Sequence, residues 1–186
     1  MFARTERLLL RPGFPEDAPA LVAAIADDHV VRQLAKVPWP YRLSDAQAFL
    51  RVQHHPLLPS LLAFERTSEA PRLVGSCALN RRPSGSVELG YWVARSEWGR
   101  GIATEACTAM IAIAQALRLP ALEASHFLDN PKSGRILEKL GFHPTGVIAP
   151  LFCKARGEDV PARFFRLGLQ RACAPQVQDD EETLAA

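Results

Sequence analysis

Residues 88–106 read Glu88-Leu-Gly-Tyr-Trp-Val-Ala-Arg-Ser-Glu-Trp-Gly-Arg-Gly-Ile-Ala-Thr-Glu-Ala106: an apolar strand, a glycine-containing loop and the start of an Ala-rich helix. The helix is expected to run from about residue 103 to residue 117. Gly99 and Gly101 let backbone N–H groups approach an anion without a Cβ in the way. The helix N-terminus adds unpaired donors and the positive end of a dipole. With the charge of Arg100 beside them, these features predict a phosphate or pyrophosphate site.

Other phosphate-binding loops fit this stretch less well. A P-loop requires Gly-Lys-Ser/Thr, which is absent. A dinucleotide fingerprint requires a third glycine at position 104, where Thr104 stands, and its strand opens a βαβ unit, whereas strand 88–93 is expected to follow a hairpin. A plain tight turn before a closely packed helix has the same glycines, so the loop alone leaves that alternative open.

Outward from this segment, hydrophobic periodicity predicts an alternation of strands and helices. The expected strands are 5–11, 61–66, 72–80, 86–93, 121–126, 142–148 and 160–169, and the expected helices are 16–26, 29–35, 45–52, 103–117 and 131–140. Leu8 and Leu10 are expected on one face of the first strand. Ser44 is expected to cap helix 45–52, with Gln47 completing a capping box. A helix between strands permits a parallel pair, so the order predicts an α/β sandwich.

Composition bounds the class of protein. The chain has 186 residues, 48% of them apolar and 23% charged, which suits one ordinary domain. Its net charge of +2 is too balanced to indicate nucleic acid or an anionic membrane as a partner. No apolar run reaches the length of a membrane span, and the first residues do not resemble a secretory signal, so a cytoplasmic location is expected. Residues 1–171 are expected to form the single domain, and the acidic residues 172–186 a disordered tail.

The four cysteines indicate neither zinc nor disulfides. Cys77, Cys107, Cys153 and Cys173 form no C-x-x-C pair and no metal-ligand spacing. We therefore expect free thiols and no bound metal.

Four segments share their pattern and order with one known family. Trp98-Gly-Arg-Gly-Ile-Ala103 matches the loop pattern Gln/Arg-x-x-Gly-x-Gly/Ala, except that Trp98 takes the Gln/Arg position. Residues 5–12, 88–93 and 130–142 match a first strand, a fourth strand and a second cofactor-binding segment. The chain thus resembles the GNAT (Gcn5-related) N-acetyltransferase superfamily, in its ribosomal-protein N-acetyltransferase-like branch, where tryptophan at that position is usual.

This resemblance implies a fold, a cosubstrate and a set of binding residues. The GNAT fold is a mixed, mostly antiparallel sheet with splayed central strands flanked by helices, and the cosubstrate is acetyl-coenzyme A. Backbone amides would hold its pyrophosphate, and those residues are Trp98, Gly99, Arg100, Gly101, Ile102, Ala103 and Thr104. Backbone groups of Val93 and Arg95 would pair with the pantetheine arm. Asn130 would contact the same arm, or cap the helix that follows it, or both.

Glu88 is the candidate general base. Acetyl transfer needs a neutral amine, and a carboxylate can remove the ammonium proton directly or through water. Glu88 faces the acceptor cleft if Val87 and Leu89 face the core. A carboxylate on an exposed strand face is the alternative.

Ser133 is the candidate partner of the leaving thiolate. The family often places a tyrosine at the position of Leu137, and this chain lacks it. Ser133 lies one helical turn after Asn130, where its hydroxyl can hydrogen-bond the sulfur; an exposed serine in a first helical turn is the alternative. Tyr91 is expected mainly to pack.

The resemblance implies direct acetyl transfer to a primary amine in a ternary complex, and leaves the amine open. A protein N-terminus and a small-molecule amine both fit. Trp39 and Tyr41 lie in the region that covers the acceptor cleft in the family, so they are expected to bind substrate or to pack. A non-catalytic acyl-coenzyme A-binding or sensing module is the alternative function. Dimers are common among relatives, which makes a homodimer an open expectation.

Overall fold

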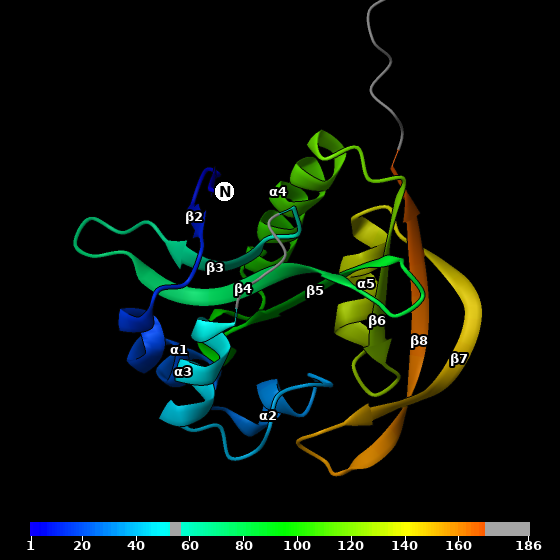
Figure 1. Cartoon of the computed structure of the whole chain (residues 1–186), viewed down its shortest axis with the longest axis horizontal. Helices are drawn as coiled ribbons and strands as arrows, with labels where there is room; N and C mark the ends of the chain where they lie inside the picture. Colours follow the sequence, from blue (N-terminus) through cyan, green and yellow to red (C-terminus); the bar gives the residue numbers. More distant parts are fainter. Residues whose placement is uncertain (53–56, 170–186) are drawn as a thin grey trace, which may run out of the picture.

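The computed structural model describes residues 1–52 and 57–169, in which one eight-stranded sheet is flanked by five α-helices (Figure 1). The strands are β1 (Ala3–Arg4), β2 (Leu8–Arg11), β3 (Ser60–Glu65), β4 (Arg72–Arg81), β5 (Val87–Val93), β6 (Ala121–Phe127), β7 (His143–Cys153) and β8 (Glu158–Gly168). The helices are α1 (Ala18–Ile25), α2 (Asp28–Val31), α3 (Leu43–Arg51), α4 (Ile102–Ala116) and α5 (Pro131–Lys139). The expected acidic tail, with Cys173, lies outside the described residues.

The sheet is mostly antiparallel and opens at its centre. Its strand order is β1-β2-β3-β4-β5-β6-β8-β7, and only β5 and β6 pair in parallel. These two strands share a single register pair, Glu88 with Glu123, and diverge beyond it (Figure 1). The expected α/β fold with splayed central strands is confirmed, as is the β4–β5 hairpin, whose turn holds Gly85 at φ 85°.

Hydrophobic cores cover both faces of the sheet. On one face, Leu8 and Leu10 are fully buried together with side chains of α4 and with Leu137 of α5. On the other face, Leu21 of α1 and Ala46 of α3 pack against β3 and β4. Each large apolar side chain buried in this way stabilises the fold by about 1.5–3 kcal/mol. The expected orientation of Leu8 and Leu10 is therefore confirmed.

The start of α3 corrects one expectation. The helix begins at Leu43 with Arg42 as its N-cap, so a capping box of Ser44 and Gln47 is wrong. The reason is Asp45, whose Oδ2 accepts a hydrogen bond from the Arg42 N–H at 2.8 Å. A carboxylate in the first turn satisfies one of the unpaired donors at a helix start, and this draws the helix two residues earlier than expected.

Other boundaries also differ from expectation. Helix 16–26 is split into a 3₁₀ turn at Pro15–Asp17 followed by α1, and the segment expected at 29–35 is helical only over α2. Strand β7 continues to Cys153 because it pairs with β8 along most of its length. Within residues 1–52 and 57–169, no helix has both the length and the apolar character needed to cross a membrane.

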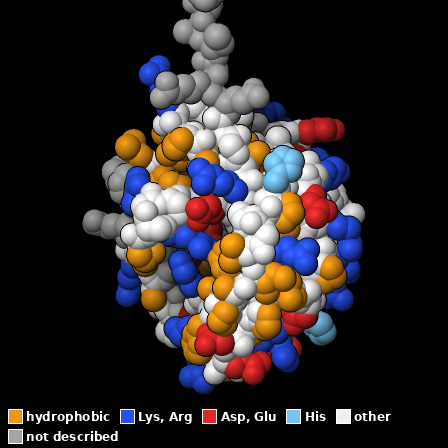
Figure 2. Space-filling view, turned by 90° about the vertical axis from the view of Figure 1, so that its right-hand side faces the viewer, with side chains coloured by type: hydrophobic (Ala, Val, Ile, Leu, Met, Phe, Trp, Pro, Cys, Tyr) orange, Lys and Arg blue, Asp and Glu red, His pale blue; other side chains and the backbone are white. Residues whose placement is uncertain are grey.

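The side of the molecule formed by β7 and β8 presents apolar side chains among charged ones (Figure 2). The exposed apolar residues of β7 are Val147, Ile148 and Phe152. Pro144 and Pro150 also lie on this strand at the edge of the sheet. Proline on an edge strand discourages pairing with another strand.

Candidate active site

A cavity of about 1150 Å³ lies where β5 and β6 diverge. It brings together most of the residues singled out from the sequence: Tyr41, Glu88, Val93, Trp98, Gly99, Gly101, Ile102, Ala103, Thr104, Asn130 and Ser133. Three others, Trp39, Arg95 and Arg100, are not among the described residues that line it. The cavity is large enough for a ligand of cofactor size.

The loop before α4 has the backbone geometry of an anion site. Gly99 and Gly101 have φ values of 83° and 79°, a region that side chains rarely adopt. Gly101 is the N-cap of α4, and the Glu105 N–H donates to its carbonyl at 3.1 Å. The N–H groups of the first three helical residues, Ile102 to Thr104, precede that bond and point out of the helix end. They can bind an anion at the positive end of the helix dipole.

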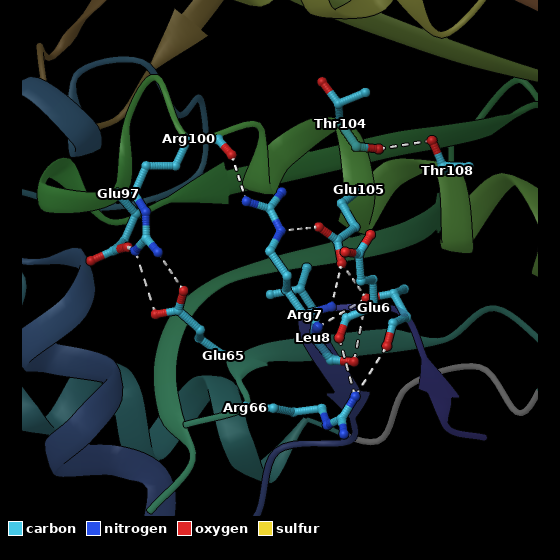
Figure 3. Close-up of polar contacts among 11 residues, drawn as sticks. Glu6, Arg7, Leu8, Glu65, Arg66, Glu97, Arg100, Thr104, Glu105 and Thr108 are labelled. Atoms are coloured by element: carbon cyan, nitrogen blue, oxygen red, sulfur yellow. Dashed lines mark hydrogen bonds and ion pairs between the residues drawn. The ribbon is translucent and has the colours of Figure 1, made fainter. Parts of the chain in front are cut away.

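The Arg100 side chain is engaged by carboxylates instead of facing an anion. Its guanidinium lies between Glu65 and Glu97 (Figure 3), with Nη2 2.6 Å from Glu65 Oε1. Arg72 closes a ring by contacting the same two carboxylates, each at 2.5 Å. Hydrogen bonds from Arg100 lower the pKa of Glu65, and hydrogen bonds from Arg72 lower the pKa of Glu97. This ring of two arginines and two glutamates holds the loop against β3 and β4. Because the Arg100 side chain is engaged in the ring, anion binding is left to the backbone of the loop.

A second ion pair fixes the first turn of α4 (Figure 3). Glu105 Oε2 lies 2.7 Å from Arg7 Nε, and Glu105 Oε1 accepts a hydrogen bond from Thr5 Oγ1 at 2.5 Å. Arg7 Nη1 donates to the Arg100 carbonyl at 2.8 Å. The segment between β1 and β2 therefore holds both the loop and the start of the helix. No local pattern in the sequence predicts this contact, because about a hundred residues separate its partners.

Val93 and Trp98 connect the end of β5 to the loop. The Ala94 N–H donates to Val74 of β4 at 2.9 Å, so the backbone groups of Val93 point the other way, toward the splay. The Val93 carbonyl accepts a hydrogen bond from Trp98 Nε1 at 2.9 Å. The Arg95 guanidinium lies over the Trp98 ring, 4.2 Å from its centroid. Trp98, at the Gln/Arg position, thus connects the loop to the end of β5 through this hydrogen bond.

Glu88 lies on the face of β5 that looks toward α1–α3. Its neighbours Val87 and Leu89 are buried in the opposite core, which is the condition set for Glu88 to face the cleft. Glu88 forms an ion pair with Arg82, and Ser125 Oγ donates to Glu88 Oε1 at 3.4 Å. The carboxylate is in the cavity wall and already has polar partners.

Ser133 and Tyr91 meet on the other face. Asn130 caps α5, since its Oδ1 accepts a hydrogen bond from the Ser133 N–H at 3.3 Å. Ser133 Oγ lies 2.7 Å from the Tyr91 hydroxyl. Tyr91 packs against the core as expected, but this hydrogen bond was missed. Strand alternation places Tyr91 on the same face as Leu89, but it does not identify Ser133 as the partner.

Two aromatic residues expected near the acceptor are placed differently. Tyr41 is buried and lines the cavity; burial, and then the charge of Asp45, raise its pKa to about 12, so the phenol is neutral. Trp39 is 43% exposed and does not line the cavity, so its substrate contact stays a prediction. No cluster of three or more metal-ligating side chains occurs in the described part of the chain.

The described cysteines are unsuited to nucleophilic chemistry. Cys77, Cys107 and Cys153 are free and buried. Burial raises the pKa of Cys77 to about 12 and raises that of Cys107 as well. A thiol that stays protonated is a poor nucleophile.

Comparisons with known proteins identify relatives over most of the chain. The family model described as "Acetyltransferase (GNAT) domain" matches residues 7–143. The uncharacterized N-acetyltransferase p20 of Bacillus licheniformis is 29% identical over 170 residues, covering 88% of this chain and 93% of the relative. The uncharacterized N-acetyltransferase YoaA of Bacillus subtilis is 30% identical over 152 residues, covering 77% and 84%.

Solved structures share the fold. A proposed ribosomal-protein-serine acetyltransferase from Vibrio cholerae superposes with a TM-score of 0.72 at 25% identity, covering 90% of this chain and 97% of that one. The ribosomal-protein acetyltransferase RimL, solved in complex with coenzyme A, superposes with a TM-score of 0.74 at 16% identity, covering 91% and 98%.

Proposed function

Because the chain belongs to the GNAT acetyltransferase family, it is an acetyltransferase, and we propose that it moves acetyl from acetyl-coenzyme A directly to a primary amine within a ternary complex. The observation that carries this proposal is the cavity at the splay of β5 and β6, lined by the anion-binding loop and by residues of both sheet faces. Such a cavity lets two substrates meet from opposite sides.

The cofactor half of the site is assembled from backbone and small side chains. The N–H groups at the start of α4 would bind the pyrophosphate, and the backbone of Val93 would pair with the pantetheine arm. The Val93 N–H points into the splay and would stabilise the oxyanion of the tetrahedral intermediate. Gly99 and Gly101 suit this role because an added Cβ would be strained at their positive φ.

The acceptor half contains the base. Glu88 would take the ammonium proton, either directly or through a water, while Ser133 on the opposite face would stabilise the leaving thiolate. Glu88 is paired with Arg82, so the approaching ammonium would compete with a guanidinium for this carboxylate. This arrangement supports direct transfer, and the buried thiols give no support to a covalent cysteine intermediate.

Charge in the cavity favours an acceptor with one amine over a polycation. The acids that line it are Asp45, Glu88 and Glu97, and the last two are paired with arginines. Lys36 and Lys154 also line the cavity. A polyamine or aminoglycoside would meet few unpaired carboxylates and would be repelled by the lysines. A protein N-terminus is the acceptor we favour, because RimL, which shares this fold, is an alpha-N-protein acetyltransferase.

An acceptor screen tests this function. Wild-type protein would be mixed with acetyl-coenzyme A and with peptides of varied N-terminus, single amino acids, polyamines or aminoglycosides, and thiol release would be followed. Thiol release that depends on a peptide and is lost in Gly101→Asp is the expected result. Preference for polycations would refute the proposed acceptor class. Tight binding of acetyl-coenzyme A with no transfer to any amine would instead support the acyl-coenzyme A-binding module.

A further inference from the structure

The hydroxyl of Tyr91 makes two contacts with a single residue of α5. It lies 2.7 Å from Ser133 Oγ and 3.3 Å from the Ser133 carbonyl oxygen. Both residues line the cavity at the splay, and the Tyr91 ring packs against the core between the sheet and α4. The phenol is therefore held by packing, with its polar end on the serine.

The two distances allow two arrangements of the hydroxyl protons. A carbonyl oxygen only accepts, and 3.3 Å is long for an O–H···O bond, whereas 2.7 Å is the commonest length. Either hydroxyl of the 2.7 Å pair can be the donor. In one arrangement Ser133 Oγ donates to Tyr91, which donates to the Ser133 carbonyl. In the other, which makes the shorter bond the only one that Tyr91 donates, the Tyr91 O–H donates to Ser133 Oγ. Each hydroxyl has one proton, so this arrangement leaves the Ser133 proton free to point into the cavity.

We propose that Tyr91 is a positioning residue: it donates to Ser133 Oγ and so turns the serine O–H toward the sulfur of coenzyme A. The inference rests on the proposed function and on the contact of Ser133 with sulfur. In the transfer step the amine nitrogen forms a bond to the acetyl carbon and loses its proton to Glu88 or to water. The carbon–sulfur bond breaks and its electron pair stays on sulfur. Ser133 stabilises that charge through a hydrogen bond, and no proton leaves either hydroxyl.

The surroundings of Tyr91 suit a fixed donor and not an acid. Burial, and then the neighbouring Cys107, raise the pKa of Tyr91, so the phenol keeps its proton across the working range. Lys132 and Arg135 of α5 line the same cavity, and His126 of β6 also lies close, with its Nε2 2.7 Å from a Cβ added at Gly134. Tyr91→Phe and Ser133→Ala change no charge. The electrostatic influence of the neighbouring titratable groups on the coenzyme A thiol is therefore the same in every variant.

The first test needs no acceptor. Bound coenzyme A would be titrated by the ultraviolet absorbance of its thiolate in wild type, Tyr91→Phe, Ser133→Ala and the double variant. A hydrogen bond to sulfur favours the thiolate, so the thiol pKa should rise by about one unit in Ser133→Ala and by about half a unit in Tyr91→Phe. The double variant should match Ser133→Ala, because Tyr91 acts only through the serine.

The second test follows turnover. Tyr91→Phe should lower kcat about 3–10-fold and Ser133→Ala about 5–30-fold, with KM for acetyl-coenzyme A unchanged and no further loss in the double variant. Ser133→Thr keeps the hydroxyl and should restore most of kcat. Ser84→Ala, at the exposed tip of the β4–β5 hairpin, is the matched control.

Several outcomes would overturn the inference. They are a wild-type thiol pKa in Tyr91→Phe, an unchanged pKa in Ser133→Ala, or additive effects in the double variant, which would mean that Tyr91 acts on sulfur by itself. The proposed function fails separately: absent acetyl transfer by wild type, with the expected pattern of thiol pKa values, would reject the reaction but not the positioning role.

Discussion

Glu88 and Tyr91 lie three residues apart on β5 and face opposite sides of the sheet. Glu88 pairs with Arg82 on the side of α1–α3, and Tyr91 reaches Ser133 on the side of α5. Strand alternation alone produces this separation. In the proposed reaction this separation keeps the carboxylate that removes a proton from the amine apart from the hydroxyls that stabilise the leaving sulfur. The hydroxyls therefore do not donate their hydrogen bonds to the carboxylate.

Gly101→Asp should weaken acetyl-coenzyme A binding about 10²-fold or more. The variant places a side chain at a φ of 79° and a negative charge beside the pyrophosphate, and two lost charge-assisted bonds are worth about 1.5–3 kcal/mol each. Calorimetry with acetyl-coenzyme A measures the effect. Gly85→Asp is the matched control, since Gly85 has a φ of 85° and is not among the described residues that line the cavity. Equal affinities in the two variants would refute the pyrophosphate assignment.

Glu88→Gln should lower kcat/KM about 10²-fold near neutral pH, because it keeps the shape of the side chain and removes its basicity. The deficit should shrink at high pH, where the amine is already neutral. Rates over a pH series give the answer. Glu123→Gln removes the same charge from the neighbouring strand and should cost far less. A flat pH dependence of the deficit would leave Glu88 as a partner of Arg82 only.

The sequence predicted the parts of the site that are local in the chain. The end of β5, the two glycines and the start of α4 follow each other within residues 88–106, so alternation and glycine geometry were sufficient. The bond between Tyr91 and Ser133 joins residues 42 positions apart. Such a contact depends on the register of a strand against a helix, which no local pattern carries.

The ring behind the loop was missed for the same physical reason. Glu65 and Arg72 come from β3 and β4, and Glu97 and Arg100 from the loop. Each is an ordinary charged residue in sequence. The helix start at Leu43 was missed because Ser44 and Asp45 both suit a helix terminus. Taking Ser44 as the cap, and not Asp45 as the acidic residue of the first turn, moves the expected boundary toward the C-terminus.

Glu97→Gln should lower the melting temperature at neutral pH and weaken acetyl-coenzyme A binding. The Glu97 side chain is only 3% exposed and contacts both Arg72 and Arg100. Hydrogen bonds from Arg72 hold the pKa of Glu97 in the folded protein below its usual range. Its contribution is therefore fully present above the unfolded-state pKa and is lost as pH falls through the folded-state pKa.

Thermal melts from neutral pH down to about pH 3 would follow that loss. The melting temperatures of wild type and Glu97→Gln should converge at the acid end. Glu69→Gln, in the exposed β3–β4 connection, should melt like wild type throughout. A difference between wild type and Glu97→Gln that persists unchanged into acid would show that the ion pairs are not its source.

Leu137→Tyr should destabilise the protein without raising kcat. The family tyrosine at this position serves as a proton donor, which makes the substitution an apparent restoration. Here Leu137 is 0% exposed inside the core between the sheet and α4, and it is not among the described residues that line the cavity. A phenol forced into that space overpacks the core at a cost of about 1–3 kcal/mol, or roughly 2–10 °C in melting temperature. Its hydroxyl would also compete for the place that Tyr91 and Ser133 occupy.

Melting curves and steady-state rates would be compared with Leu137→Met, which conserves volume and should cost less. A Leu137→Tyr protein that melts like wild type and turns over faster would show that α5 can present a donor from this position, and that thiolate protonation limits the reaction.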